Sequence, residues 1–159
     1  HSFGWVADHI NASFLFLPFG TASPWDDRVS NGWVASKSKF WRKNSVFYGQ
    51  PSPQDALDIL SCCDAAVTSR LHAAIFCTLA GVPFLDLTHH DKTMDYLRTA
   101  GLEDCSVPYW DASKASLRDR LGNILSNRAR EGGRLLAVAK DFRGDLLAAC
   151  GSFQPMMTA

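Results

Sequence analysis

An arginine and a histidine, separated by one leucine, follow a short apolar segment near the middle of this 159-residue chain. The stretch from Val67 to Ile75 predicts a strand that runs straight into a helix, with Arg70 and His72 in the first helical turn. The first N–H groups of a helix have no partner within it, and the helix dipole makes that end partly positive. With the charge of Arg70 added, this junction becomes a candidate site for a phosphate or carboxylate group.

Each of these side chains also has a structural interpretation. Arg70 could form an ion pair with a structural carboxylate such as Asp86 or Asp64, and its position alone leaves both hypotheses open. For His72 the position alone favours a ring packed at the helix start, although beside a bound anion it could act as a general acid or base. Ser69 next to His72 suggests a nucleophile and a base, but no orienting acid is evident, which argues against a hydrolase.

A second group of polar residues, 88–92, follows the next expected strand. Lys92 could supply another positive charge for a phosphate, although a solvated lysine at a helix start is the simpler interpretation. His89 and His90 are adjacent, and the chain has no H-x-H, H-x-x-x-H or H-E-x-x-H spacing, so we expect no metal site.

The composition is that of a folded globular domain. The chain carries 16 basic and 16 acidic residues, so its overall charge does not favour nucleic acid as a partner. No apolar run approaches the ~18 residues of a membrane span, no signal peptide is evident, and the five cysteines are odd in number. We therefore expect a cytoplasmic protein with buried, reduced thiols. A basic cluster over residues 37–43 is either a solvated loop or a contact with an anionic, lipid-linked substrate at the inner membrane face.

Apolar segments of strand length alternate with segments of helical periodicity. Strands are expected at 14–19, 45–48, 64–68, 82–87 and 105–107. This alternation predicts an α/β fold with a doubly wound parallel sheet of Rossmann-like type, in one domain over residues 1–159. In such sheets ligands bind beyond the carboxyl ends of the strands, where three polar segments are expected: 20–27, 69–72 and 88–92.

Capping residues mark the expected helix boundaries. Ser23 and Ser52 each stand before a proline and an aspartate with the spacing of a helix N-cap, and Asp91 is a candidate cap for a later helix. Gly81 is placed to take the left-handed position that ends the helix begun at Arg70. Other helical faces are expected through Phe3, Val6 and Ile10, through Trp25, Val29 and Trp33, through Leu117, Leu121, Ile124 and Leu125, and, after Gly132-Gly133, through Leu135, Val138, Phe142 and Leu146.

A set of ordered motifs resembles the polysaccharide pyruvyltransferases. The chain reads Ser-Arg-Leu-His-Ala-Ala-Ile over 69–75, Leu-Ala-Gly-Val-Pro over 79–83, Asp-Lys over 91–92 and Ala-Gly-Leu over 100–102. That family typically shows an Arg-Leu-His-Ala segment, a Gly-Val-Pro entry to a strand, and an aspartate and lysine after that strand. The close resemblance spans residues 55–102, and the remainder agrees in the order of its elements.

The resemblance implies a GT-B-like enzyme of two domains. It would transfer pyruvate from phosphoenolpyruvate to a sugar of a cell-surface polysaccharide or its precursor, forming a ketal without a further cofactor. The resemblance implies that Arg70, beside Ser69, holds the carboxylate or phosphate of the donor. His72 is the acid/base residue, and Lys92 adds charge for the phosphate.

The resemblance also bears on the acceptor and on the rest of the protein. The family has a tyrosine where this chain has His89 and His90, so both histidines are candidate substrate-binding residues, and the departure bears on acceptor specificity. The saccharide acceptor, free or lipid-linked, would lie in a cleft between two domains. Because the chain starts at His1 and not at a methionine, we expect it to be the C-terminal part of a longer protein whose N-terminal domain is missing.

Two other functions fit the same architecture. The chain could be the C-terminal, nucleotide-sugar-binding half of a GT-B glycosyltransferase, which would place a glutamate against a ribose. Its only glutamates, Glu103 and Glu131, lie away from the expected strand–helix junctions, which argues modestly against that function. A non-catalytic domain of the same fold is the third possibility, against which the presence of Arg70 and His72 counts.

Overall fold

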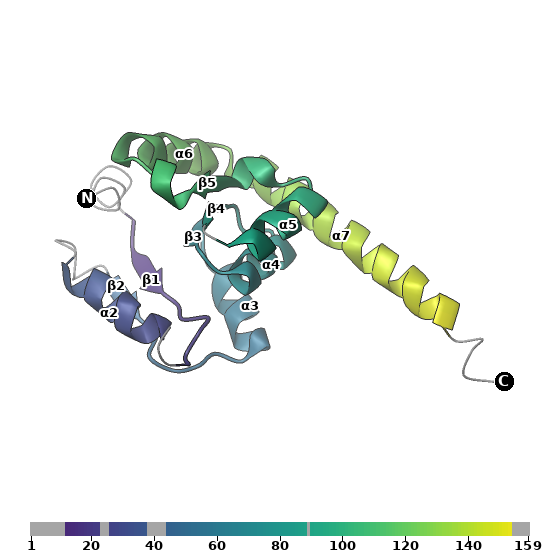
Figure 1. Ribbon diagram of the computed structural model, residues 1–159, viewed down its shortest axis with the longest axis horizontal. Coiled ribbons are helices and arrows are strands. Elements are labelled where there is room, and N and C mark those ends of the chain that lie inside the picture. The colour runs from purple at the N-terminus through teal and green to yellow at the C-terminus, as the bar shows by residue number, and fades with distance from the viewer. Residues whose placement is uncertain (1–11, 23–25, 38–43, 89, 154–159) are drawn as a thin grey trace.

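The computed structural model describes residues 12–22, 26–37, 44–88 and 90–153. Strands and helices alternate along them (Figure 1). The elements are β1 (Phe14–Phe16), α2 (Asp27–Lys37), β2 (Asn44–Val46), α3 (Pro53–Ser61), β3 (Ala66–Thr68), α4 (Leu71–Ala80), β4 (Phe84–Thr88), α5 (Asp91–Thr99), η2 (Glu103–Cys105), β5 (Ser106–Pro108), η3 (Tyr109–Asp111), α6 (Lys114–Ser126) and α7 (Arg128–Phe153).

The strands of the described residues pair in parallel, which confirms the predicted α/β, Rossmann-like fold class. β3, β4 and β5 form one sheet in that order, with Thr68 opposite Asp86 and Asp86 opposite Ser106. β1 and β2 form a second sheet of two strands. β1 is shorter than the apolar run 14–19 that predicted it, because the run reaches Pro18, which has no N–H to donate to a ladder.

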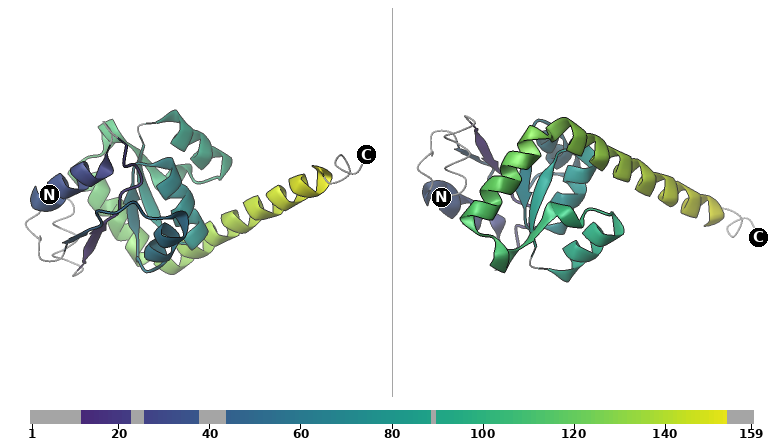
Figure 2. Two further views of the ribbon diagram at one scale, coloured as in Figure 1. Left: turned by 90° about the horizontal axis from the view of Figure 1, so that it is seen from below. Right: turned by 90° about the horizontal axis from the view of Figure 1, so that it is seen from above.

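The larger of two hydrophobic clusters in the described residues is built around α4. This helix packs against α3 and α7 (Figure 2). A helix that packs against two others needs apolar residues on more than one side. In α4 the buried residues are Ala73, Ala74, Cys77 and Thr78. Beyond α4, the buried members of this core cluster are Leu60, Phe84, Leu97, Leu102 and Leu135.

Two glycines permit the close packing of α7 against the end of α4. Gly81 ends α4 with a φ of 64°, which confirms the predicted left-handed cap. A Cβ at Gly132 would lie 2.6 Å from the carbonyl oxygen of Gly81, so only glycine fits at this position. The prediction that the last helix starts after Gly132-Gly133 is therefore wrong: α7 begins at Arg128 and carries Gly132 at its point of contact with α4.

The predicted N-caps had mixed outcomes. At α3 the Ser52 side chain accepts a hydrogen bond from the Asp55 N–H at 3.1 Å, and Asp55 accepts one in return from the Ser52 N–H at 3.2 Å, which confirms this cap. α2 starts at Asp27, later than expected, and Asp26 accepts a hydrogen bond from the Arg28 N–H at 2.9 Å. Asp91 lies in the first turn of α5, after the cap position. Ser23, and the face through Phe3, Val6 and Ile10, lie outside the described residues.

Two expectations about burial are wrong in part. Val29 and Trp33, expected on an apolar face of α2, are 71% and 64% exposed. Of the five cysteines, all of them free, Cys77 is buried whereas Cys62 and Cys150 are exposed. An apolar spacing therefore did not suffice to predict burial at either place.

α7 extends well beyond the core. Its first half packs on α4, and its second half projects away from the other elements in all the views (Figures 1 and 2). Residues 141–150 are exposed. No helix among the described residues, α7 included, has the length and apolar character needed to cross a lipid bilayer.

Candidate functional site

The segment that carries Arg70 and His72 and the segment that carries Lys92 lie at one edge of the three-stranded sheet. β3 and β4 are neighbours and run parallel, so their carboxyl ends meet at the same edge. Ser69 and Arg70 follow β3, and His90 and Lys92 follow β4. This is the edge at which open α/β sheets bind ligands.

Arg70 is held by the strand that precedes it. It is the N-cap residue of α4, with extended backbone angles of φ −122° and ψ 131°, and therefore lies just before the helical turn in which it was expected. The hydroxyl of Thr68 accepts a hydrogen bond from the Arg70 N–H at 3.1 Å and donates one to its carbonyl oxygen at 3.2 Å. Because Thr68 is buried at the end of β3, these two bonds fix where the arginine leaves the sheet.

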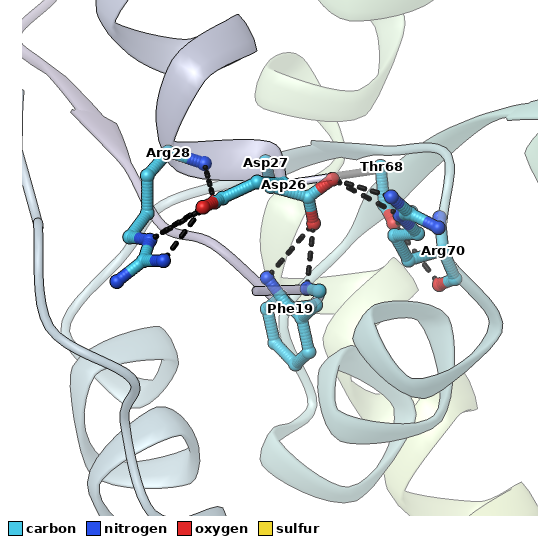
Figure 3. A network of polar contacts seen from close by, with 7 residues as sticks. Phe19, Asp26, Asp27, Arg28, Thr68 and Arg70 are labelled. Carbon is cyan, nitrogen blue, oxygen red and sulfur yellow. Dashed lines mark hydrogen bonds and ion pairs between the residues drawn. The ribbon is translucent and has the colours of Figure 1, made fainter. Parts of the chain in front are cut away.

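The guanidinium of Arg70 forms an ion pair with Asp27, the first residue of α2 (Figure 3). Nε and Nη2 of Arg70 both donate to Oδ1 of Asp27, at 3.2 and 2.5 Å. The other carboxylate oxygen, Oδ2, accepts hydrogen bonds from the N–H groups of Phe19 and Gly20 at 3.0 and 2.8 Å. One carboxylate thus joins the loop after β1, the start of α2 and the start of α4.

The partner of Arg70 differs from the two carboxylates that the sequence suggests. Asp64, one of them, pairs with Arg128, and Asp86, the other, is buried in the middle of β4. The ion pair with Asp27 joins residues 43 positions apart, a contact that no local pattern could indicate. The available signal was the expectation that residues 20–27 and 69–72 meet at one edge of the sheet, and Asp27 lies in the first of these segments.

The neighbouring aspartate has a local role. Asp26 pairs with Arg28, two positions along, with a shortest separation of 2.6 Å between Nη2 and Oδ2. Hydrogen bonds from the Arg28 side chain lower the pKa of Asp26. Asp26 and Asp27 thus form two ion pairs of the same kind, of which only the second reaches another part of the chain.

The remaining candidate side chains are accessible. Ser69, His72, His90 and Lys92 are exposed, and Arg70 is half-buried, with 35% of its side chain accessible. His89 lies outside the described residues. An anion approaching this edge would therefore meet an arginine held on one side by Asp27, with a histidine two residues further along the chain.

Two hollows lie elsewhere on the molecule. One, of about 150 Å³, is bordered by the start of β4 and by Arg120, Arg130 and Arg134, at the opposite edge of the sheet. The other, of about 470 Å³, is an apolar groove between α4, α5 and α7 that Leu79 and Phe142 help to line. Within the described ranges, no three histidine, cysteine or acidic side chains are grouped so that they could hold a metal ion.

Comparison with known proteins gives one match. Residues 9–91 match the polysaccharide pyruvyl transferase family, which is more than half of the chain. The chain belongs to this family. The match includes Asp27, Arg70 and His72, and it ends one residue before Lys92. No curated protein and no solved structure matched the chain.

Membership in the family agrees with the resemblance seen in the motifs, but the two cover different lengths. The family match begins far upstream of residues 55–102, whose motifs resemble the family, and so includes β1, α2 and β2. Asp27 and Arg70 therefore both lie within the residues that match the family.

Proposed function

We propose that this chain is the C-terminal half of a two-domain enzyme that transfers a pyruvyl group from phosphoenolpyruvate to a sugar. The observation that carries the proposal is the family match, which covers β3 and α4. The position of Arg70 and His72 after the carboxyl end of β3, where open α/β sheets bind ligands, supports it. The acceptor is a saccharide of a cell-surface polysaccharide or its precursor. A lipid-linked acceptor would place this cytoplasmic reaction at the inner face of the membrane.

The reaction needs a proton donor and charge stabilisation. A sugar hydroxyl adds to C2 of phosphoenolpyruvate while C3 accepts a proton and becomes a methyl group. A second hydroxyl of the same sugar then displaces phosphate from C2 and closes the ketal. In this proposal His72 moves the protons, because it is the titratable side chain nearest in sequence to the arginine.

The anionic groups of the donor need positive partners. Arg70 binds the carboxylate or phosphate of phosphoenolpyruvate, with Ser69 beside it, and Lys92 adds charge for the departing phosphate. His89 and His90, which lie between β4 and α5 in the sequence, contact the substrate in this proposal. The exposure of His72 and Lys92 supports a site that another domain completes, so we expect the 159 residues alone to bind donor weakly and to turn over negligibly.

Ligand-induced stabilisation tests this proposal. Phosphoenolpyruvate should raise the melting temperature of the chain whereas UDP should not, because the site is proposed to recognise a three-carbon acid and not a nucleotide. Arg70→Ala should abolish the shift. Arg28→Ala, which removes the neighbouring ion pair with Asp26, is the matched control and should keep it. Stabilisation by UDP alone would instead favour a nucleotide-sugar glycosyltransferase. Rapid ketal formation by the isolated chain would contradict the proposal that a second domain is needed to complete the site.

A further inference from the structure

The carboxylate of Asp27 is anchored independently of Arg70. Its Oδ2 accepts the N–H groups of Phe19 and Gly20, and Asp27 itself is the first residue of α2. Moving this side chain away from its place would break both backbone bonds and leave two N–H groups without an acceptor in a partly buried loop. Asp27 is therefore a fixed point, and a ligand could not displace it without that cost.

The geometry of the pair determines which part of Arg70 Asp27 uses. Oδ1 of Asp27 accepts from Nε and Nη2, which form one edge of the planar guanidinium. Two donors that converge on one oxygen fix which edge of the guanidinium faces Asp27, which a contact through one nitrogen would not do. The backbone on the other side is fixed by Thr68, so the arginine is oriented at both ends.

We propose that Asp27 is a positioning residue, one that orients Arg70 for the donor and thereby lets the site distinguish phosphoenolpyruvate from inorganic phosphate. This inference rests on the proposed function of the site. Charge alone attracts both anions, and the negative charge of Asp27 weakens that attraction for each of them. Orientation favours the ligand whose carboxylate and phosphate have a fixed separation, and that ligand is phosphoenolpyruvate.

Asp27→Asn should affect the two anions differently, because it removes both the negative charge of Asp27 and its orientation of Arg70. Loss of a negative charge should leave the affinity for inorganic phosphate unchanged or higher. An asparagine has one acceptor oxygen, so it can serve Arg70 or the two backbone N–H groups but not both. The preference for phosphoenolpyruvate should therefore fall by about tenfold, the loss expected for a charge-assisted hydrogen bond.

The experiment compares the dissociation constants of phosphoenolpyruvate and inorganic phosphate, measured by NMR titration of the 159-residue chain. Asp26→Asn is the matched control: it removes an adjacent ion pair that does not involve Arg70, and it should keep the wild-type preference. If Asp27→Asn keeps that preference, the positioning role is overturned. A merely structural role would weaken both ligands together and leave their ratio unchanged.

Two variants of Arg70 separate this inference from the proposed function. Arg70→Ala should lose the preference, and if it does so while Asp27→Asn keeps it, the proposed function stands and the positioning role falls. No preference in the wild-type chain overturns both. Arg70→Lys covers the case in which Asp27→Asn does not fold: lysine keeps the charge but has no planar edge, so a wild-type preference in Arg70→Lys would also overturn the positioning role.

Discussion

The candidate site joins two regions that differ in how they are held together. The central unit (β3, α4, β4, α5 and α7) buries side chains completely: Phe84 and Leu135 are each 1% exposed and Leu97 is 0% exposed. The amino-terminal unit (β1, α2 and β2) leaves Val29 and Trp33 mostly exposed. Arg70 belongs to the first unit and Asp27 to the second, so the orientation of the arginine depends on the less buried one.

Polar and apolar contacts join the two units. Besides the ion pair, the Phe19 ring lies against Phe76 of α4 with a separation of 5.8 Å between ring centres. Leu17 also packs against the core cluster around α4, and Phe14 of β1 packs against a second buried cluster that includes Leu85 of β4. Because the two units are buried to different extents, we expect them to lose stability through different substitutions, so that damage to one can leave the other intact.

The largest effect is expected in the central unit, from Gly132→Ala. The new Cβ would lie 2.6 Å from the carbonyl oxygen of Gly81, so α7 must move away from α4, at a cost of about 2–3 kcal/mol in the free energy of unfolding. Urea denaturation measures this. Gly133→Ala is the matched control, since nothing lies within 4 Å of a Cβ there and alanine favours a helix by about 0.5–1 kcal/mol. Equal effects of the two substitutions would contradict the close contact.

A smaller and more local effect is expected from Asp27→Asn. We expect a loss of about 1–2 kcal/mol, because the side chains of the pair are partly exposed and solvent weakens their attraction. Hydrogen exchange should become faster in β1 and α2 while the amides of β3 and β4 keep their protection. Equal acceleration in both units would show that they unfold together.

The core thiol gives a pH-dependent effect confined to the central unit. Burial raises the pKa of Cys77 to about 12, from an ordinary value of 9.0. The stabilisation from its neutral form is therefore complete below pH 9 and is lost as the pH rises toward 12. By pH 10 the loss should be about 1.4 kcal/mol. Unfolding free energies at pH 8 and pH 10 should differ less in Cys77→Ala than in the wild type, and an identical pH dependence would argue against a buried thiol.

The smallest effect is expected on the exposed face of the amino-terminal unit. Trp33 is 64% exposed, so Trp33→Ala should change the free energy of unfolding by no more than about 0.5 kcal/mol. Thermal denaturation followed by circular dichroism is sufficient to measure it. A substantially larger loss would mean that this face is covered in solution.

Local patterns predicted the order of the elements and several of their ends. The Ser52 cap and the left-handed Gly81 depend on a few neighbouring residues, and both are confirmed. The parallel pairing follows from the alternation of strands and helices, and it placed the candidate segments at one edge.

Contacts between distant segments account for what the sequence did not predict. Asp27 was within an expected polar segment, but its choice of Arg70 as partner depends on how β1 and β3 are placed in space. Gly132 resembled a helix boundary, because a glycine needed for close packing and a glycine that ends a helix look alike in sequence. The same limit applies to α2, whose apolar spacing carries no information on whether another element covers it.

The projecting half of α7 has a consequence for how the molecule exchanges hydrogen with solvent. Phe142 stacks on Tyr96, with 6.3 Å between ring centres, and beyond it the helix continues with exposed residues, Gly144 among them. A helix without a packed face is marginal in water, so this end keeps its shape only by continuity with the packed half. Amide protection should therefore fall off from Phe142 toward the carboxyl end, and the residue at which it is lost marks where the hydrophobic core ceases to support the helix.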